Sequence, residues 1–374
     1  MKTSRLAVLL AAGCAAVFLA PLVLAQDGPQ APSSDTVAKP RKPAGTEGAQ
    51  PEQQTIPTEY KKKDEVPEAI FRSNATTVSV DVAVLDNKGR FIPNIPAGNF
   101  RILEDNVPQR IETTAKAEAP MTVCMLIEFS ARYQWYGGAA WYQTLPAAYG
   151  FAQSLKRDDY IAVIAYDMKP EILSDFSTDR TKTYEGLQRL RIPGFSESNL
   201  FDALVDAEER MENIEGRKAI VLLSSGVDTF SKLTFDKARK RIQEAGVPVF
   251  AISLMQALRI VNESRMGSIA EMTFLQADNQ MRTFAKETGG QSFFPRFYGE
   301  FPSIYQAISE ALRNEYTFTY HPTNQARDGG YRRIKVELVN PATNEPLRVV
   351  DEKQKPIKYQ IIARQGYKAP HEVE

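Results

Sequence analysis

The stretch Met121-Thr-Val-Cys-Met-Leu-Ile127 is almost continuously apolar. A strand that is covered by helices on both faces needs apolar side chains on both, so such a run predicts a buried strand of a parallel sheet. Further runs of this kind occur at residues 160–165, 219–223 and 247–254. Together they predict the centre of one α/β sheet.

Helical patterns separate these apolar runs. The alternation of strand and helix predicts right-handed crossovers and therefore a doubly wound, mostly parallel sheet. Residues 256–277 interrupt the pattern, and their composition is compatible with a short packed helix or with a flap that faces a partner. The helices are expected at residues 142–155, 181–190, 200–214, 235–245, 278–287 and 301–313.

The segments before and after this central section have a different hydrophobic pattern. Val78, Val80, Val82 and Val84 alternate with smaller or polar residues, which is typical of a half-buried strand. The same alternation returns after Asn314. We therefore expect a small β-sandwich-like domain into which the α/β domain is inserted. Its further strands are expected at residues 100–103, 109–113, 316–320, 334–338 and 359–363.

The amino terminus has the features of a secretory signal peptide. Lys2 and Arg5 precede an apolar run that extends to Ala25 and contains Pro21. We expect cleavage after residue 25 and an exported protein that is periplasmic, envelope-associated or extracellular. The alternative is an uncleaved membrane anchor, because the run has nearly the length that spans a bilayer.

These patterns predict the following domain organisation. Residues 1–25 form the signal peptide, and residues 26–66 form a disordered linker rich in Pro and Gln. The β domain is made of residues 67–118 and 314–367, and it encloses the α/β domain of residues 119–313. Residues 368–374 are a tail.

Bulk composition and motifs argue against nucleic-acid binding and catalysis. Lys+Arg and Asp+Glu both number 46, so removal of Lys2 and Arg5 leaves 44 − 46 = −2 and no basic field for nucleic acid. Only His321 and His371 could serve a zinc site or a catalytic triad, and common nucleophile and phosphate motifs are absent. We interpret Asp158-Asp159 and Glu208-Glu209 as helix-end or exposed-face charges, and Cys124 as a buried thiol. The sequence therefore predicts a protein that is not an enzyme.

Several motifs, taken in order, resemble one family. The chain resembles the von Willebrand factor type A (VWFA)-related proteins of the acidobacterial type over roughly residues 71–367. This resemblance implies a von Willebrand factor A-like α/β domain with a flanking β domain. The motifs that carry it are Glu104-Asp105-Asn106, Ile220-Val-Leu-Leu-Ser-Ser-Gly226, Thr288-Gly-Gly290, Tyr331-Arg-Arg-Ile-Lys-Val336 and Ala363-Arg-Gln-Gly-Tyr367.

The resemblance also implies a metal-ion-dependent adhesion site at the carboxyl edge of the sheet. Glu128, Ser130 and Ser198 occupy three of its ligand positions, but Glu128 and Ser225 stand where the family has aspartates. Mg²⁺ favours octahedral oxygen ligation that includes carboxylates. Arg132 adds a positive charge that could pair with Glu128 instead. We therefore expect a degenerate site without a cofactor, and Mg²⁺ binding is the alternative.

An aromatic loop follows directly. Tyr133, Trp135 and Tyr136 precede Gly137-Gly138, and Trp141-Tyr142 comes next. Aromatic and Arg side chains dominate protein-binding surfaces, so we expect partner contacts here. The alternative is that these rings pack on the sheet as the first helix begins. The candidate partner-binding residues are Arg132, Tyr133, Trp135, Tyr136 and Ser225.

The resulting expectation is an exported, noncatalytic adhesion or interaction module whose partner is another protein. One alternative is a metal-dependent adhesion domain that uses Glu128, Ser130 and Ser198. Another is a structural component of an envelope complex that makes contact through the β domain. Membrane contact is expected only if the amino-terminal anchor is retained.

Overall fold

The computed structural model describes residues 77–371, except 88, 116–119, 132–138, 192–194, 215, 263–265 and 351–353. All of the described residues belong to one of the chain's two units, Thr55–Glu374. The predicted signal peptide and linker lie outside the described residues. So do four of the candidate partner-binding residues, namely Arg132, Tyr133, Trp135 and Tyr136.

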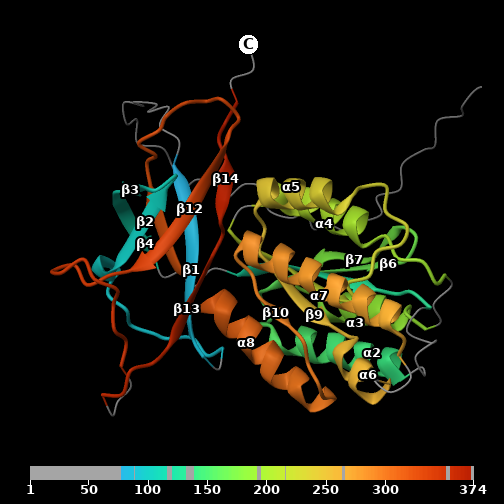
Figure 1. Ribbon diagram of the computed structural model, residues 1–374. Helices are drawn as coiled ribbons and strands as arrows, with labels where there is room; N and C mark the ends of the chain where they lie inside the picture. Colours follow the sequence, from blue (N-terminus) through green and yellow to red (C-terminus); the bar gives the residue numbers. More distant parts are fainter. Residues whose placement is uncertain are drawn as a thin grey trace, which may run out of the picture. The chain divides into compact units, whose positions relative to one another are not determined.

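A mixed sheet forms the centre of the α/β part (Figure 1), with the strand order β10-β9-β8-β5-β6-β7. All neighbours are parallel except β7, which runs antiparallel to β6. This arrangement confirms the predicted α/β class. The strands are β5 (Met121–Glu128), β6 (Tyr160–Tyr166), β7 (Pro170–Ser177), β8 (Arg217–Ser224), β9 (Val249–Ser253) and β10 (Ser292–Phe293).

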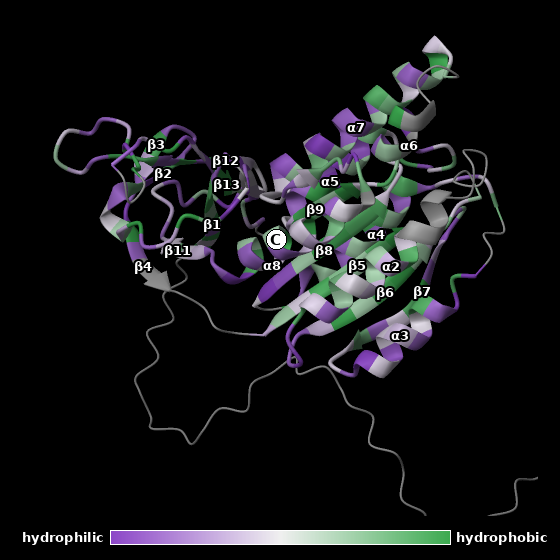
Figure 2. Cartoon of the chain, turned by 90° about the horizontal axis from the view of Figure 1, so that it is seen from below, coloured by the Kyte–Doolittle hydropathy of each residue, from purple (hydrophilic) through white to green (hydrophobic). Residues whose placement is uncertain are grey.

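Helices cover both faces of this sheet. Successive residues of β5 point to opposite faces, so Met125 belongs to one hydrophobic cluster and Leu126 to the other. The central strands are correspondingly hydrophobic in Figure 2. The first cluster includes α2 (Ala139–Ser154), α3 (Arg180–Gln188) and α8 (Phe301–Arg313). The second includes α4 (Leu200–Glu212) and α5 (Phe235–Ala245).

The segment that the sequence left open is largely helical. It holds α6 (Gln256–Asn262) and the beginning of α7 (Ser268–Thr288), so α7 starts ten residues before the predicted 278. Phe274 packs in the first cluster and Phe284 in the second. The described part of the chain contains no helix that is both long and apolar enough to cross a membrane.

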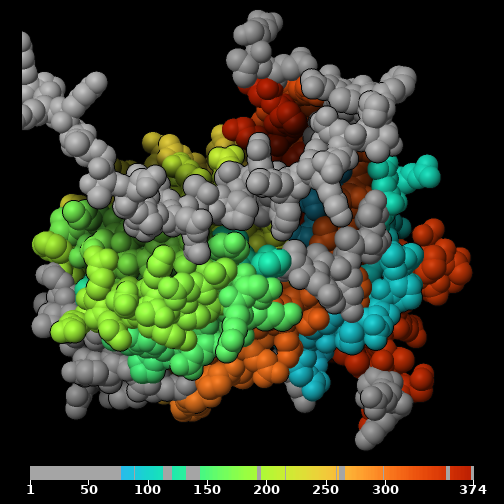
Figure 3. Space-filling view, turned by 180° about the vertical axis from the view of Figure 1, so that it is seen from behind, coloured from blue at the N-terminus to red at the C-terminus, as the bar shows by residue number. Residues whose placement is uncertain are grey.

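Two antiparallel sheets make up the β part, in the orders β13-β1-β11-β4 and β14-β12-β2-β3. Val80, Ile102, Phe318 and Ile334, one from each of four strands, share its hydrophobic core. In Figure 3 residues from the early part of the described chain (cyan) lie beside residues from its late part (orange to red), and β1 pairs with β11 while β2 pairs with β12. The strands are β1 (Val78–Asp86), β2 (Phe100–Glu104), β3 (Val107–Gln109), β4 (Ile111–Ala115), β11 (Tyr316–Tyr320), β12 (Tyr331–Leu338), β13 (Tyr359–Ala363) and β14 (Gly366–Lys368).

A buried acid connects the two antiparallel sheets. Glu104 is 2% exposed, and its Oε2 accepts hydrogen bonds from the hydroxyls of Tyr320 at 2.8 Å and Tyr367 at 3.0 Å. Burial raises the pKa of both tyrosines, so both remain donors. Glu104 and Tyr367 thus have a structural reason to occur in two of the motifs that carry the family resemblance.

The Thr288-Gly-Gly290 motif ends α7 where it meets the β part. A Cβ on Gly290 would lie 2.0 Å from the carbonyl oxygen of Val249, and Gly289 adopts a φ of +81° that favours glycine. The main-chain N–H of Gln365 donates to the carbonyl of Glu287 at 3.1 Å. Close backbone packing therefore accounts for both glycines.

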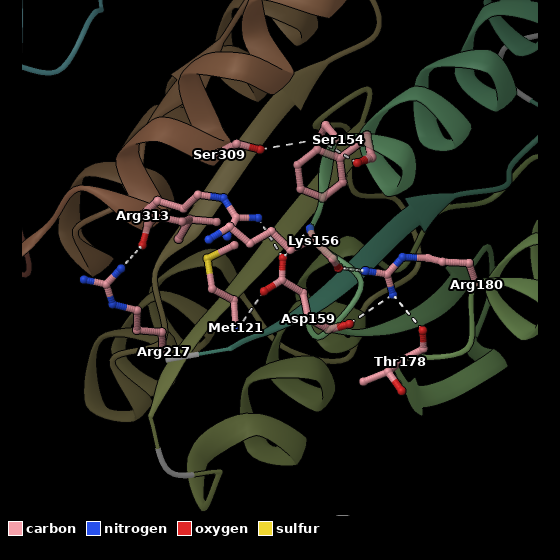
Figure 4. Close-up of polar contacts among 11 residues, drawn as sticks. Met121, Ser154, Lys156, Asp159, Thr178, Arg180, Arg217, Ser309 and Arg313 are labelled. Carbon is pink, nitrogen blue, oxygen red and sulfur yellow. Dashed lines mark hydrogen bonds and ion pairs between the residues drawn. The ribbon is translucent and has the colours of Figure 1, made fainter. Parts of the chain in front are cut away.

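Two acidic residues are buried, contrary to the sequence interpretation. Asp159 is fully buried and accepts from the main-chain N–H groups of Met121 and Lys156 and from Arg313, at 2.8 to 3.0 Å (Figure 4). This contact fastens the end of α8 to the amino edge of the sheet. Glu208 is 1% exposed, and burial raises its pKa well above the ordinary value.

Candidate functional site

The carboxyl edge of the parallel sheet holds Glu128 at the end of β5. Glu128 is fully buried, and its Oε1 accepts a hydrogen bond from Ser130 Oγ at 2.8 Å. Its Oε2 accepts three more, from Ser224 Oγ at 2.8 Å, Ser225 N at 2.7 Å and Ser225 Oγ at 2.8 Å. Four donors therefore compensate for the burial of this carboxylate.

The sheet order explains why these residues meet. β5 and β8 are parallel neighbours with Ile127 opposite Leu223, so the residues that follow both strands emerge at one edge. The chain then turns at Gly226, which has a φ of +76°. A Cβ there would lie 2.6 Å from Met281 Sδ. Glycine therefore suits this turn, which directly follows the Ser225 donor.

Tyr166 extends the network from the end of β6. Its hydroxyl donates to Ser224 Oγ at 2.8 Å, and the same oxygen accepts the main-chain N–H of Gly226 at 2.8 Å. Burial and the nearby charge of Glu128 raise the pKa of Tyr166 well above its ordinary value. Ser224 and Tyr166 were missed in the sequence because only the pairing of β5, β6 and β8 places them beside Glu128.

Ser198 is buried near this network but is held differently. Its main-chain N–H donates to Thr229 Oγ1 at 3.0 Å, and its carbonyl accepts from the N–H groups of Thr229 and Phe230. Among the described contacts, the Glu128 carboxylate is bound by Ser130, Ser224 and Ser225, not by Ser198. The structure therefore brings two of the three predicted metal ligands into contact.

In this arrangement the side chains around Glu128 do not provide the ligands that Mg²⁺ needs. Glu128 supplies the only carboxylate in the network, and hydroxyl or amide protons already point at both of its oxygens. Within the described residues, no group of three His, Cys, Asp or Glu side chains could hold a metal ion. An octahedral ion would have to displace these donors, and among the described contacts it would gain Glu128 as its one carboxylate ligand.

Of the candidate partner-binding residues, Ser225 is the one that lies within the described part of the chain. Ser225 is 1% exposed, which places it beneath the surface and not on it. Phe195 and Phe230, which the sequence interpretation did not select, are 56% and 49% exposed. The carbonyl of Phe195 accepts the N–H of Ala131 at 2.6 Å, so the main chain of Phe195 lies beside Ala131.

The first turns of α7 project beyond this edge, as Figure 2 shows. The carbonyl of Ala277 lies level with Gly226, 3.0 Å from the position of a Cβ on that glycine. The nine residues from Ser268 to Gln276 therefore extend about 14 Å further, at a helical rise of about 1.5 Å per residue. Ile269 and Met272 on this projection are 83% and 70% exposed.

A mostly buried ion pair holds the base of this projection. Arg259 of α6 contacts Asp278 of α7 at 2.7 Å, with side-chain exposures of 15% and 6%. Burial raises the pKa of Asp278, and Arg259 opposes this change. The pair joins α6 to α7 where α7 leaves the sheet.

Comparisons with known proteins give structural matches. No family model matches the sequence, and no curated protein matches it. The vWF domain of the type V pili tip protein Mfa5 from Porphyromonas gingivalis is similar over 52% of this chain and 97% of that chain, with 14% identity and a TM-score of 0.41. Von Willebrand factor A domains are thus among the solved structures similar to this chain.

Two further matches differ in coverage. A von Willebrand factor type A structure from Catenulispora acidiphila is similar over 80% of this chain and 76% of that chain, with 10% identity and a TM-score of 0.41. Proximal thread matrix protein 1 from the mussel byssus is similar over 53% of this chain, with 12% identity and a TM-score of 0.39. The match spans 49% of the mussel protein, about half of its length.

Proposed function

We propose that this chain is an exported, noncatalytic module that binds another protein through the carboxyl edge of its α/β sheet. The observation that carries this proposal is where the exposed hydrophobic side chains lie. Seven of the ten large hydrophobics that are exposed in the described residues belong to segments that follow the carboxyl ends of strands or precede helices at that edge. They are Phe195, Phe230, Ile260, Ile269, Met272, Leu275 and Phe297.

We call these seven residues the carboxyl-edge hydrophobic set. Exposed apolar side chains cost free energy in water, so their concentration in one region of a soluble fold is typical of a contact surface. Ile269, Met272 and Leu275 are spaced by three along α7, which places them on neighbouring turns of the projecting helix. Such a helix can insert apolar side chains into a partner.

The Glu128 network favours recognition without a metal. Its carboxylate is fully occupied by hydroxyl and amide donors, so it has no free oxygen to present to a ligand. The buried serines then serve to fix the loops that carry Phe195 and Phe230. We therefore propose that binding rests on apolar contact and that no cofactor takes part.

The proposal of a noncatalytic role rests on the side chains that a hydrolytic mechanism would need. Ser130, Ser224 and Ser225 donate their hydroxyl protons to a carboxylate, with no histidine next to them to act as a base. His321 contacts Glu112 at 3.2 Å, and the main chain of His371 pairs with Asp328, so both histidines belong to the β part. Export is proposed from Lys2, Arg5 and the apolar run that follows them.

A capture experiment tests the proposal. The protein from residue 26 onward is immobilised and exposed to an envelope fraction of the source organism. The test variant carries Ile269→Ser, Met272→Ser and Leu275→Ser. The matched control carries Val107→Ser and Val350→Ser, which are 50% and 43% exposed and lie in the β part. Exposed substitutions change stability by only about 0.5 kcal/mol each, so both variants should remain folded.

We expect one protein to be captured by the wild type and the control and lost by the α7 variant. Equal capture by all three forms would show that the projecting helix is not the contact surface. If only the control variant fails to capture the protein, the contact surface lies on the β part.

A further inference from the structure

Two sheets of this protein end in open strands that face one groove. β13 is the last strand of its antiparallel sheet, and β10 is the last strand of the mixed sheet (Figure 1). An edge strand pairs on one side only, so half of its main-chain N–H and C=O groups point away from its neighbour. Within the described residues, no main-chain hydrogen bond joins residues Gln360 to Ala363 to any strand or loop other than β1.

The groove beside this edge has a volume of about 370 Å³. Gln360, Ile361, Ile362 and Ala363 of β13 line one side, and side chains from α7 and β10 line the other. Beyond Ala363 the chain approaches the end of α7 closely, because a Cβ on Gly289 would lie 2.5 Å from the main-chain nitrogen of Arg364.

The charged side chains that line the groove are both positive. Arg282 and Lys286, one turn apart on α7, both line it and are both exposed. Neither forms an ion pair within the described residues, and none of the described residues lining the groove is Asp or Glu. The guanidinium of Arg282 lies 4.0 Å from the centre of the Phe294 ring, which holds it in place while its N–H groups remain available.

We propose that this groove binds an extended acidic segment of a partner protein, which adds as a strand to the free edge of β13 and places its carboxylates against Arg282 and Lys286. Main-chain pairing supplies affinity in this mode of recognition, and side-chain contacts supply selectivity. Residues Gln360 to Ala363 span about 13 Å at about 3.3 Å per residue, so the added strand pairs over about four residues. This surface is separate from the carboxyl-edge hydrophobic set, and the inference does not depend on the proposed function.

The test uses a fluorescein-labelled peptide of four Val-Glu repeats and the full chain, with binding followed by fluorescence anisotropy at low ionic strength. A peptide of four Val-Lys repeats is the charge control. We expect saturable binding of the Val-Glu peptide alone. The variant Arg282→Glu with Lys286→Glu should weaken this binding at least tenfold. The matched control, Lys237→Glu with Lys240→Glu on exposed positions of α5, should leave it within twofold.

Strand addition is distinguished from simple charge attraction by two further measurements. A Val-Glu peptide that is N-methylated at every residue cannot donate main-chain hydrogen bonds and should not bind. Hydrogen exchange at the amides of residues Gln360 to Ala363 should slow when the unmodified peptide is added. The proposal is overturned if the Val-Glu and Val-Lys peptides bind equally, if the charge reversal has no effect, or if the methylated peptide binds as tightly as the unmodified one.

Discussion

The main chain and the side chain of Ser225 both donate to the same oxygen of Glu128, at 2.7 Å and 2.8 Å. One residue thus satisfies a buried carboxylate twice, through its main chain and through its side chain. Ser130 and Ser224 supply the other two donors, so both oxygens of Glu128 accept hydrogen bonds.

Ser225→Ala should lower the free energy of unfolding by about 2 kcal/mol, because it removes a buried hydrogen bond to a charged group. The N–H donor of residue 225 remains in this variant, so the fold should persist. Urea denaturation measures the change. Ser196→Ala, at an exposed position, is the control and should stay within about 0.5 kcal/mol of the wild type. A Ser225→Ala variant as stable as the control would mean that the network contributes nothing to the fold.

Millimolar Mg²⁺ should leave the melting temperature unchanged. A ligand that binds the native state alone stabilises it by mass action, so a working metal site would raise the Tm. Differential scanning calorimetry with Mg²⁺, with Mn²⁺ and with EDTA measures this. A rise in Tm that disappears in Ser130→Ala would restore the metal-dependent adhesion alternative.

Stability should fall as the pH rises, in part because of Glu315. Burial, and then the charge of Asp81, raise the pKa of Glu315 well above 4.5, whereas Arg217 opposes the change. The folded state therefore binds the proton more tightly than the unfolded state. The resulting stabilisation is complete below about pH 4.5 and is lost as the pH rises through the folded pKa, at about 1.4 kcal/mol per pH unit.

Glu315→Gln should flatten this dependence and raise the stability at pH 8 relative to the wild type. Glu208 has a pKa shifted in the same direction, so some slope should persist. Unfolding free energies from urea titrations between pH 5 and pH 9 test this. An identical slope in the wild type and the variant would exclude Glu315 as its source.

Gly290→Ala should destabilise the protein by at least about 1 to 3 kcal/mol, because its Cβ would meet backbone 2.0 Å away. Gly267→Ala is the matched control, since no atom lies within 4 Å of a Cβ there. Thermal melting of both variants measures the difference. Equal melting temperatures would remove close packing as the reason for the second glycine of Thr288-Gly-Gly290.

The sequence predicted the elements whose burial pattern is regular. β5 and β8 are apolar on both faces because helices cover both, and β1 alternates because one face meets the core. β7 was not predicted: it is an antiparallel edge strand with an irregular register against β6, so its side chains show neither pattern. The first turns of α7 were not predicted because their exposed Ile269, Met272 and Leu275 and their buried Phe274 do not form a single core-facing apolar stripe.

The candidate site was predicted in part. The resemblance in motif order pointed to Glu128, Ser130 and Ser225, but not to Ser224, which is a further donor to the carboxylate. Ser224 contacts Glu128 only because of the register between β5 and β8, which local sequence does not specify. The charge pair Asp158-Asp159 was misinterpreted for a similar reason. Two of the partners of Asp159 come from distant segments, namely Met121 at the start of β5 and Arg313 at the end of α8.

The proposed partner contact is tested most directly by crosslinking in living cells. A photoreactive amino acid is placed at Met272 on the projecting end of α7 or, as the control, at Val107 on β3; these side chains are 70% and 50% exposed. We predict that Met272 crosslinks to one envelope or extracellular protein, that Val107 does not, and that EDTA leaves the yield unchanged. Absence of any crosslink from Met272, or its loss in EDTA, would contradict metal-independent binding through the carboxyl edge.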